Sequence, residues 1–153
     1  IKPTKRDIIK IIKYKRKSNL LNHLKSSLAR SGNINGEIQD NLILLWTVDG
    51  FAPLFFPIHQ FYFDDDGVLI KISSKLNYFG KLFIILMPAL IITSILFDNG
   101  FELDFLKYKA ATIVVLLFLF ILIFTFYSIY QFERKSDLKY LAKIIDKNTK
   151  NAT

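Results

Sequence analysis

Two histidines and a run of three aspartates are the residues of this chain whose types are best suited to chemistry. A metal site on one helix face would need a His-x-x-x-His or Glu-x-x-His pair, and neither His23 nor His59 belongs to one. Residues 64–67, Asp-Asp-Asp-Gly, lack the alternating ligands and the later glutamate of a calcium loop. The sequence therefore predicts no metal site. It predicts a surface position for His23, a structural role for His59 and a turn at 64–67.

Patterns typical of nucleophilic catalysis and of phosphate binding are also missing. The chain contains no cysteine, which excludes disulfides, thiolate metal sites and cysteine nucleophiles. It contains no Gly-x-Ser-x-Gly motif and neither of the glycine-rich motifs that bind nucleotide phosphates. We expect a protein that is not an enzyme and that binds no cofactor.

Two apolar segments dominate the second half of the chain. Residues 110–130 contain no charge, glycine or proline, and as a helix they would be about 31 Å long, the thickness of a bilayer's hydrocarbon core. Residues 78–97 form the other segment, with Lys81 near its start and Pro88 near its middle. We expect two transmembrane helices. The Lys81 amine should reach the headgroups, and Pro88 should bend its helix.

The charges around these segments predict their orientation. Residues 1–17 carry eight basic residues against one acidic residue, and the segment after Tyr130 carries six against three. The short connection at 98–109 carries two against three and makes the two helices an antiparallel hairpin. Because basic flanks stay on the cytoplasmic side, we expect both termini in the cytoplasm, at a bacterial inner membrane rather than an organellar one.

Residues 1–17 form a basic amphipathic segment. Thr4 and Asp7 are spaced as a capping pair at the start of a helix, and the following isoleucines share one helical face. Two interpretations remain open: the helix lies on an anionic membrane surface, or its isoleucines pack on the rest of the domain. Tyr14 is the only aromatic residue here, so we expect anionic lipid, and no nucleic acid, as the partner of these basic residues.

A second helix is predicted after Ser18, which can cap it, and before Gly32, which can end it. The two helices would together cover about residues 4–31. Four leucines recur at helical spacing and predict the buried face of the second helix: Leu20, Leu21, Leu24 and Leu28. Residues 33–36, Asn-Ile-Asn-Gly, predict a turn.

Residues 42–73 predict a small antiparallel sheet of three or four strands, at 42–48, 51–58, 60–63 and 68–72. Asp49-Gly50 is a hairpin dipeptide, and the prolines at 53 and 57 place their strand at an edge or break it with bulges. The alternative, a membrane span at 41–63, is disfavoured because Asp49 near its middle would cost about 2.5–3.5 kcal/mol on insertion.

The predicted fold class is an α+β membrane protein with three parts. Residues 1–77 form a cytoplasmic module of helices and sheet, residues 78–130 the transmembrane hairpin, and residues 131–153 a cytoplasmic helix and tail. In the last part, Leu138, Leu141, Ile144 and Ile145 form a stripe that can dock on the sheet or on a partner.

This organisation predicts a non-enzymatic subunit, accessory or anchoring factor of a larger assembly of membrane proteins. Two alternatives stay open: an immunity protein that neutralises a toxin at the membrane, and a module that binds anionic lipid. The residues predicted to contact the membrane surface or a partner are Lys10, Lys13, Arg16, Lys17, Trp46, Phe55 and Phe56. The alternative, that the three aromatic residues form the core of the module, is the one that we favour.

Overall fold

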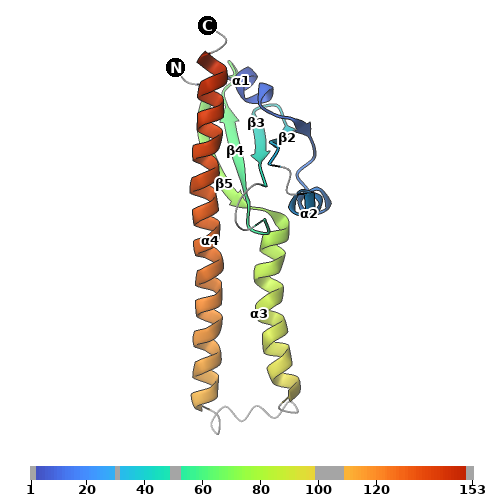
Figure 1. Cartoon of the computed structure of the whole chain (residues 1–153), viewed down its shortest axis with the longest axis vertical. Coiled ribbons are helices and arrows are strands. Elements are labelled where there is room, and N and C mark those ends of the chain that lie inside the picture. The colour runs from blue at the N-terminus through green and yellow to red at the C-terminus, as the bar shows by residue number, and fades with distance from the viewer. Residues whose placement is uncertain (1–2, 30–31, 49–52, 99–108, 151–153) are drawn as a thin grey trace.

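A computed structural model of the chain describes residues 3–29, 32–48, 53–98 and 109–150 (Figure 1). Within these ranges the protein is a mixed α+β structure with a five-stranded sheet and one long apolar helix. The elements are α1 (Lys5–Lys10), β1 (Tyr14–Lys15), α2 (Leu20–Ala29), β2 (Asn35–Ile38), β3 (Leu42–Trp46), β4 (Pro57–Phe63), β5 (Leu69–Leu76), α3 (Tyr78–Asp98) and α4 (Lys109–Lys150).

The five strands lie in the order β1-β2-β3-β4-β5. β1 is parallel to β2, and the other neighbouring strands are antiparallel. The sheet is wider than the three or four strands expected within 42–73, because β1 comes from a predicted helix and β2 from a predicted turn. The two helices expected within 4–31 are present as α1 and α2, but α1 ends at Lys10 and β1 separates it from α2. The turn at 64–67 is confirmed, and Gly67 there has a φ of 75° that favours glycine.

The described part of residues 41–63 contains β3 and β4 rather than a helix, which agrees with the sheet interpretation. The strand at 51–58 was expected at an edge or broken by bulges, and the edge alternative is wrong for the described part: residues 53–56 lie before β4, and β4 lies between β3 and β5. Pro57 is tolerated because it is the first residue of the strand. The Asp49-Gly50 dipeptide lies outside the described residues.

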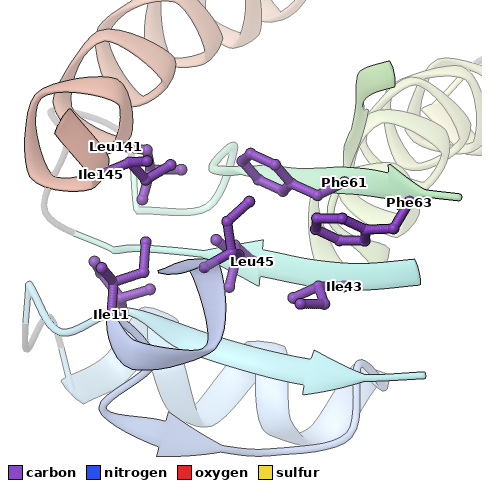
Figure 2. Close-up of a cluster of buried hydrophobic side chains, with 9 residues drawn as sticks. Ile11, Ile43, Leu45, Phe61, Phe63, Leu141 and Ile145 are labelled. Carbon is purple, nitrogen blue, oxygen red and sulfur yellow. The ribbon is translucent and has the colours of Figure 1, made fainter. Parts of the chain in front are cut away.

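One face of the sheet is covered by α1 and α4 (Figure 2). Their isoleucines and leucine join side chains of the inner strands in one buried cluster: Ile8, Ile11, Ile34, Ile43, Leu45, Phe61, Phe63, Leu141 and Ile145. Gly36 of β2 allows a close approach here, since a Cβ at this position would lie 2.7 Å from Cδ1 of Ile12. The isoleucines of the basic segment thus pack on the domain, and the stripe of the C-terminal helix docks on the sheet.

The capping pair at the start of α1 is confirmed. The Asp7 carboxylate accepts from the Thr4 backbone N–H at 2.9 Å, and the Asp7 N–H lies 3.4 Å from the Thr4 hydroxyl. These hydrogen bonds with Thr4 lower the pKa of Asp7 below its ordinary value.

α3 and the N-terminal half of α4 lie side by side and extend away from the sheet, whereas the C-terminal half of α4 lies along the sheet (Figure 1). Residues Ile113–Thr149 of α4 form the one described helix long and apolar enough to cross a membrane, and Tyr78–Ser94 of α3 is a shorter apolar helix that contains Pro88. The rings of Phe83 and Phe126 meet between the two helices at 5.7 Å. Most other apolar side chains described on these helices are exposed or half-buried.

Candidate functional site

The junction between α2 and α3 gathers the most unusual side chains of the described structure. Tyr78 is the first residue of α3, and its ring stacks on the imidazole of His23 with centroids 5.4 Å apart. Trp46 and Phe56 approach the same imidazole edge-on at 5.2 and 5.7 Å. Three aromatic rings from three different segments therefore surround one histidine, which lies at the start of the apolar helix α3.

His23 is fully buried, so the predicted surface position is wrong. Its Nδ1 accepts from the Tyr78 backbone N–H at 3.4 Å, and its Nε2 lies 3.1 Å from the Ser18 hydroxyl. A neutral ring with its proton on Nε2 satisfies both contacts. Burial lowers the pKa of His23 from 6.5 to about 4, and the positive charge of Lys75 adds to this shift.

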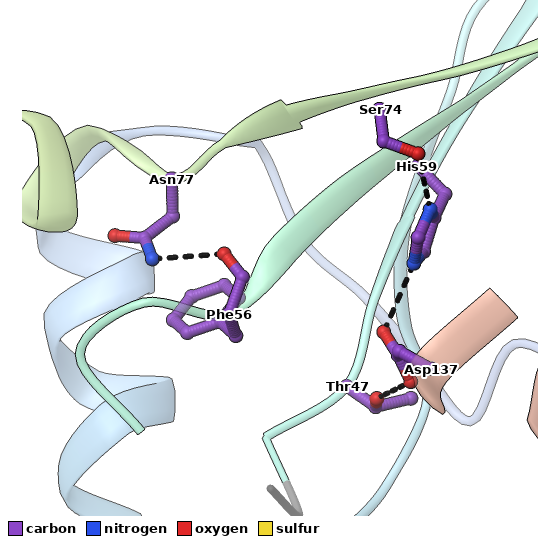
Figure 3. Close-up of polar contacts among 6 residues, drawn as sticks. All are labelled: Thr47, Phe56, His59, Ser74, Asn77 and Asp137. Atoms are coloured by element: carbon purple, nitrogen blue, oxygen red, sulfur yellow. Dashed lines mark hydrogen bonds and ion pairs between the residues drawn. The ribbon is translucent and has the colours of Figure 1, made fainter. Parts of the chain in front are cut away.

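Asn77 ties the loop before β4 to the first turn of α3 (Figure 3). Its buried amide nitrogen donates to the carbonyl oxygens of Leu54 and Phe56, each at 2.9 Å. Its side-chain oxygen accepts from the Gly80 N–H at 2.8 Å, which caps the helix. A Cβ at Gly80 would lie 2.8 Å from the Leu54 oxygen, so glycine lets the loop pack against α3.

α2 buries the face opposite to the one predicted. Ser26 and Ser27 are buried with His23, and the Trp46 indole donates to the Ser26 hydroxyl at 3.3 Å. Three of the four leucines of the predicted stripe lie outward, with Leu21 68% and Leu28 77% exposed, whereas Leu24 is half-buried. The cap also differs: the side chain of Asn19 accepts the N–H of the first turn, while the Ser18 hydroxyl faces His23.

An apolar groove of about 520 Å³ lies beside these leucines, between α2 and the start of α3. Its walls come from α2, the loop before β4 and the first turn of α3: Leu24, Ser27, Leu28, Pro53, Leu54, Phe55 and Phe79. Two amines lie close by, because Lys75 and Lys81 both place Nζ 5.9 Å from the centroid of the Tyr78 ring. The junction therefore combines an apolar surface with positive charge.

A polar cluster fastens α4 to the sheet (Figure 3). His59 is fully buried; its Nδ1 lies 2.8 Å from the Ser74 hydroxyl and its Nε2 lies 3.1 Å from the Asp137 carboxylate, which also accepts from Thr47. The residue types are those of a Ser-His-Asp triad, but the ring nitrogens are exchanged, since in a triad Nε2 faces the serine and Nδ1 faces the aspartate. Ser74 also faces His59 directly across the β4–β5 ladder, as structural cross-strand pairs do. We therefore interpret the cluster as the attachment of α4.

The structure divides the predicted contact residues between two places. Lys10, Lys13, Arg16 and Lys17 lie at the end of α1 and along β1, where the guanidinium of Arg16 lies 5.1 Å from the Tyr14 ring. Trp46, Phe55 and Phe56 are buried near the α2–α3 junction. The two groups do not share one surface, and the aromatic residues belong to the core.

Asn77, Gly80 and the inverted face of α2 were not identified from the sequence. A signal was present for Asn77, because Asn directly before an apolar run is a typical N-cap. Nothing comparable marked α2, since its leucine stripe has ordinary helical spacing. No protein family, curated protein or solved structure matches this chain.

Proposed function

We propose that this protein is a membrane-anchored subunit or accessory factor that presents its sheet to another membrane protein. α3 would cross the bilayer beside the apolar half of α4, as a transmembrane hairpin. The support is geometric: a helix the length of α3 spans about 31 Å, and residues 109–130 of α4 run beside it over about the same length. Both lengths suit the hydrocarbon core.

The exposed surface of these helices supports the same placement. Leu90 on α3 and Phe120 on α4 are among many large apolar side chains exposed at their ends away from the sheet. Soluble proteins rarely expose continuous apolar surface on this scale. In a bilayer the same surface would be covered by acyl chains.

The orientation follows from charge and from the position of the ends. α1 and the last turns of α4 lie at the same end of the molecule, with the sheet beside them (Figure 1). The basic residues of both segments favour the cytoplasm for this end. Leu141 and Ile145 attach α4 to the sheet and fix the domain relative to the helices.

The edge strand β5 is the observation that favours a protein partner. It is eight residues long and lies at one edge of the sheet. Ile70 on it is 65% exposed, and Ile72 is exposed as well. The strand carries two of the lysines that often protect such an edge, Lys71 and Lys75, but it is long and exposes two isoleucines, and its free backbone groups can pair with another chain. We propose that an extended segment of the partner pairs with β5.

Affinity purification from native membranes in mild detergent, followed by mass spectrometry, tests this function. The unchanged chain and the control Tyr14→Lys, at the opposite edge of the sheet, should retain the same membrane proteins. The double variant Ile70→Lys and Ile72→Lys should lose them. Recovery of the unchanged chain alone would contradict the proposal, and a toxin as the retained partner would assign the chain to the immunity class instead.

A further inference from the structure

The helix α2 is amphipathic, but its polar face is buried and its apolar face is exposed, the reverse of a surface helix in water. Its buried face is made of His23, Ser26 and Ser27, and its outer face carries Leu20, Leu21 and Leu28. A surface helix in water normally buries its leucines and exposes its serines. The inversion is stabilised by partners for the polar atoms, since the Ser27 hydroxyl donates to the His23 carbonyl at 3.0 Å. The outer leucines therefore need an apolar environment from outside the domain.

The position of α2 indicates which environment this is. α2 packs beside the first turn of α3, where His23 contacts Tyr78 and where the groove joins Leu28 to Phe79. Figure 1 shows α2 nearly end-on while α3 lies in the plane of the picture, so the two helices cross steeply. If α3 crosses a bilayer, α2 lies along the bilayer surface at the depth where the hydrocarbon begins.

We propose that α2 is an interfacial helix whose leucines lie among the acyl chains of the cytoplasmic leaflet. The inference rests on the proposed membrane anchoring. The groove beside Leu24 and Leu28 accommodates an acyl chain, and Lys75 and Lys81 next to Tyr78 bind the phosphates of the same lipids. Lys25 flanks the leucine face and can extend its amine toward the headgroups.

This assignment differs from the membrane contact predicted for residues 1–17. α1 packs on Leu141 and Ile145, which lie eleven and fifteen residues beyond Tyr130 on the same helix. At 1.5 Å per residue these positions are about 17 and 23 Å from the end of the apolar segment. Leu24 and Leu28 of α2, in contrast, line a groove together with Phe79 in the first turn of α3.

The absence of cysteine makes a direct test simple, because single cysteines can carry a nitroxide spin label. The full chain is reconstituted in vesicles of phosphatidylcholine and phosphatidylglycerol, and collisions of the label with oxygen and with a water-soluble nickel chelate are measured. Leu28→Cys is the test position. Asn22→Cys on another face of α2, Lys143→Cys on the exposed side of α4 and Phe120→Cys in the apolar half of α4 are the controls.

We expect the label at Leu28 to collide several-fold more often with oxygen relative to nickel than the labels at Asn22 and Lys143. Suppose that the label at position 28 is as accessible to nickel as the label at position 143, while the label at position 120 collides mainly with oxygen. The inference about α2 is then wrong, and the membrane anchoring stands. If Phe120 is also accessible to nickel, the anchoring itself fails. A Leu28 label shielded from both reagents would indicate that a second copy of the chain covers α2, which also overturns the proposal.

Discussion

Replacing Asn77 with alanine tests how the sheet is joined to α3. The substitution removes the cap acceptor for the Gly80 N–H and the donors for the carbonyl groups of Leu54 and Phe56. Loss of a cap costs about 1 kcal/mol. A buried acceptor left without a donor costs about 1–3 kcal/mol, and two are affected here. With partial relaxation of the loop, we expect the free energy of unfolding to fall by about 3 kcal/mol.

Asn19→Ala provides a matched control on α2. The side chain of Asn19 accepts the Asn22 N–H at 2.9 Å in an exposed cap, so its loss should cost only about 1 kcal/mol. Asn77→Asp keeps a cap acceptor but loses the amide donor and places a carboxylate beside two carbonyl oxygens. It should therefore destabilise at least as much as alanine.

The assay is equilibrium unfolding of the detergent-solubilised protein by sodium dodecyl sulfate, followed by circular dichroism. The expected order of stability is unchanged chain, Asn19→Ala, and then Asn77→Ala with Asn77→Asp. If Asn77→Ala costs no more than Asn19→Ala, the two loop carbonyls find other donors, and the buried side chain does not hold the junction.

Two further substitutions probe the other buried polar groups. Asp137→Ala removes the carboxylate partner of buried His59. We expect the free energy of unfolding to fall by about 2 kcal/mol and hydrogen exchange in the C-terminal half of α4 to become faster. Asp137→Asn should lower the free energy of unfolding by less. Equal exchange in both variants and the unchanged chain would argue against attachment by this side chain. His23 has a pKa of about 4 in the folded protein against 6.5 when unfolded, so its contribution is complete above pH 6.5 and declines as the pH falls toward 4. The free energy of unfolding should drop by about 2 kcal/mol between pH 7 and pH 5, and His23→Gln should remove most of that drop; an unchanged slope would refute the assignment.

Local sequence patterns accounted for much of the secondary structure. The apolar run at 42–48 formed β3, the turn at 64–67 formed around Gly67, and the capping pair of Thr4 and Asp7 opens α1. Each of these depends on residues within one or two turns of each other. The apolar segments at 78–97 and 110–130 were evident for the same reason, since length and composition are properties of the segment alone.

Segments without strong local preference were placed by pairing and packing. Asn35 and Gly36 are typical turn residues, yet β2 forms because Gly36 accommodates Ile12 and because β3 supplies hydrogen-bond partners. The residues predicted to contact the membrane surface or a partner also lie in two places, because tertiary packing separates them. The basic members lie along the sheet edge, while Trp46 and Phe56 became walls of the His23 site.

The sequence by itself determined that the chain is α+β, that apolar helices dominate its second half, and where the turn at 64–67 and the cap of α1 lie. The tertiary structure alone decided which side of α2 faces inward. A leucine stripe and a serine–histidine stripe on one helix are equally regular, and the buried one is selected by the partners available to it. Here Trp46, Phe56 and Tyr78 meet the polar face, because β3, the loop before β4 and α3 converge on it from distant parts of the chain.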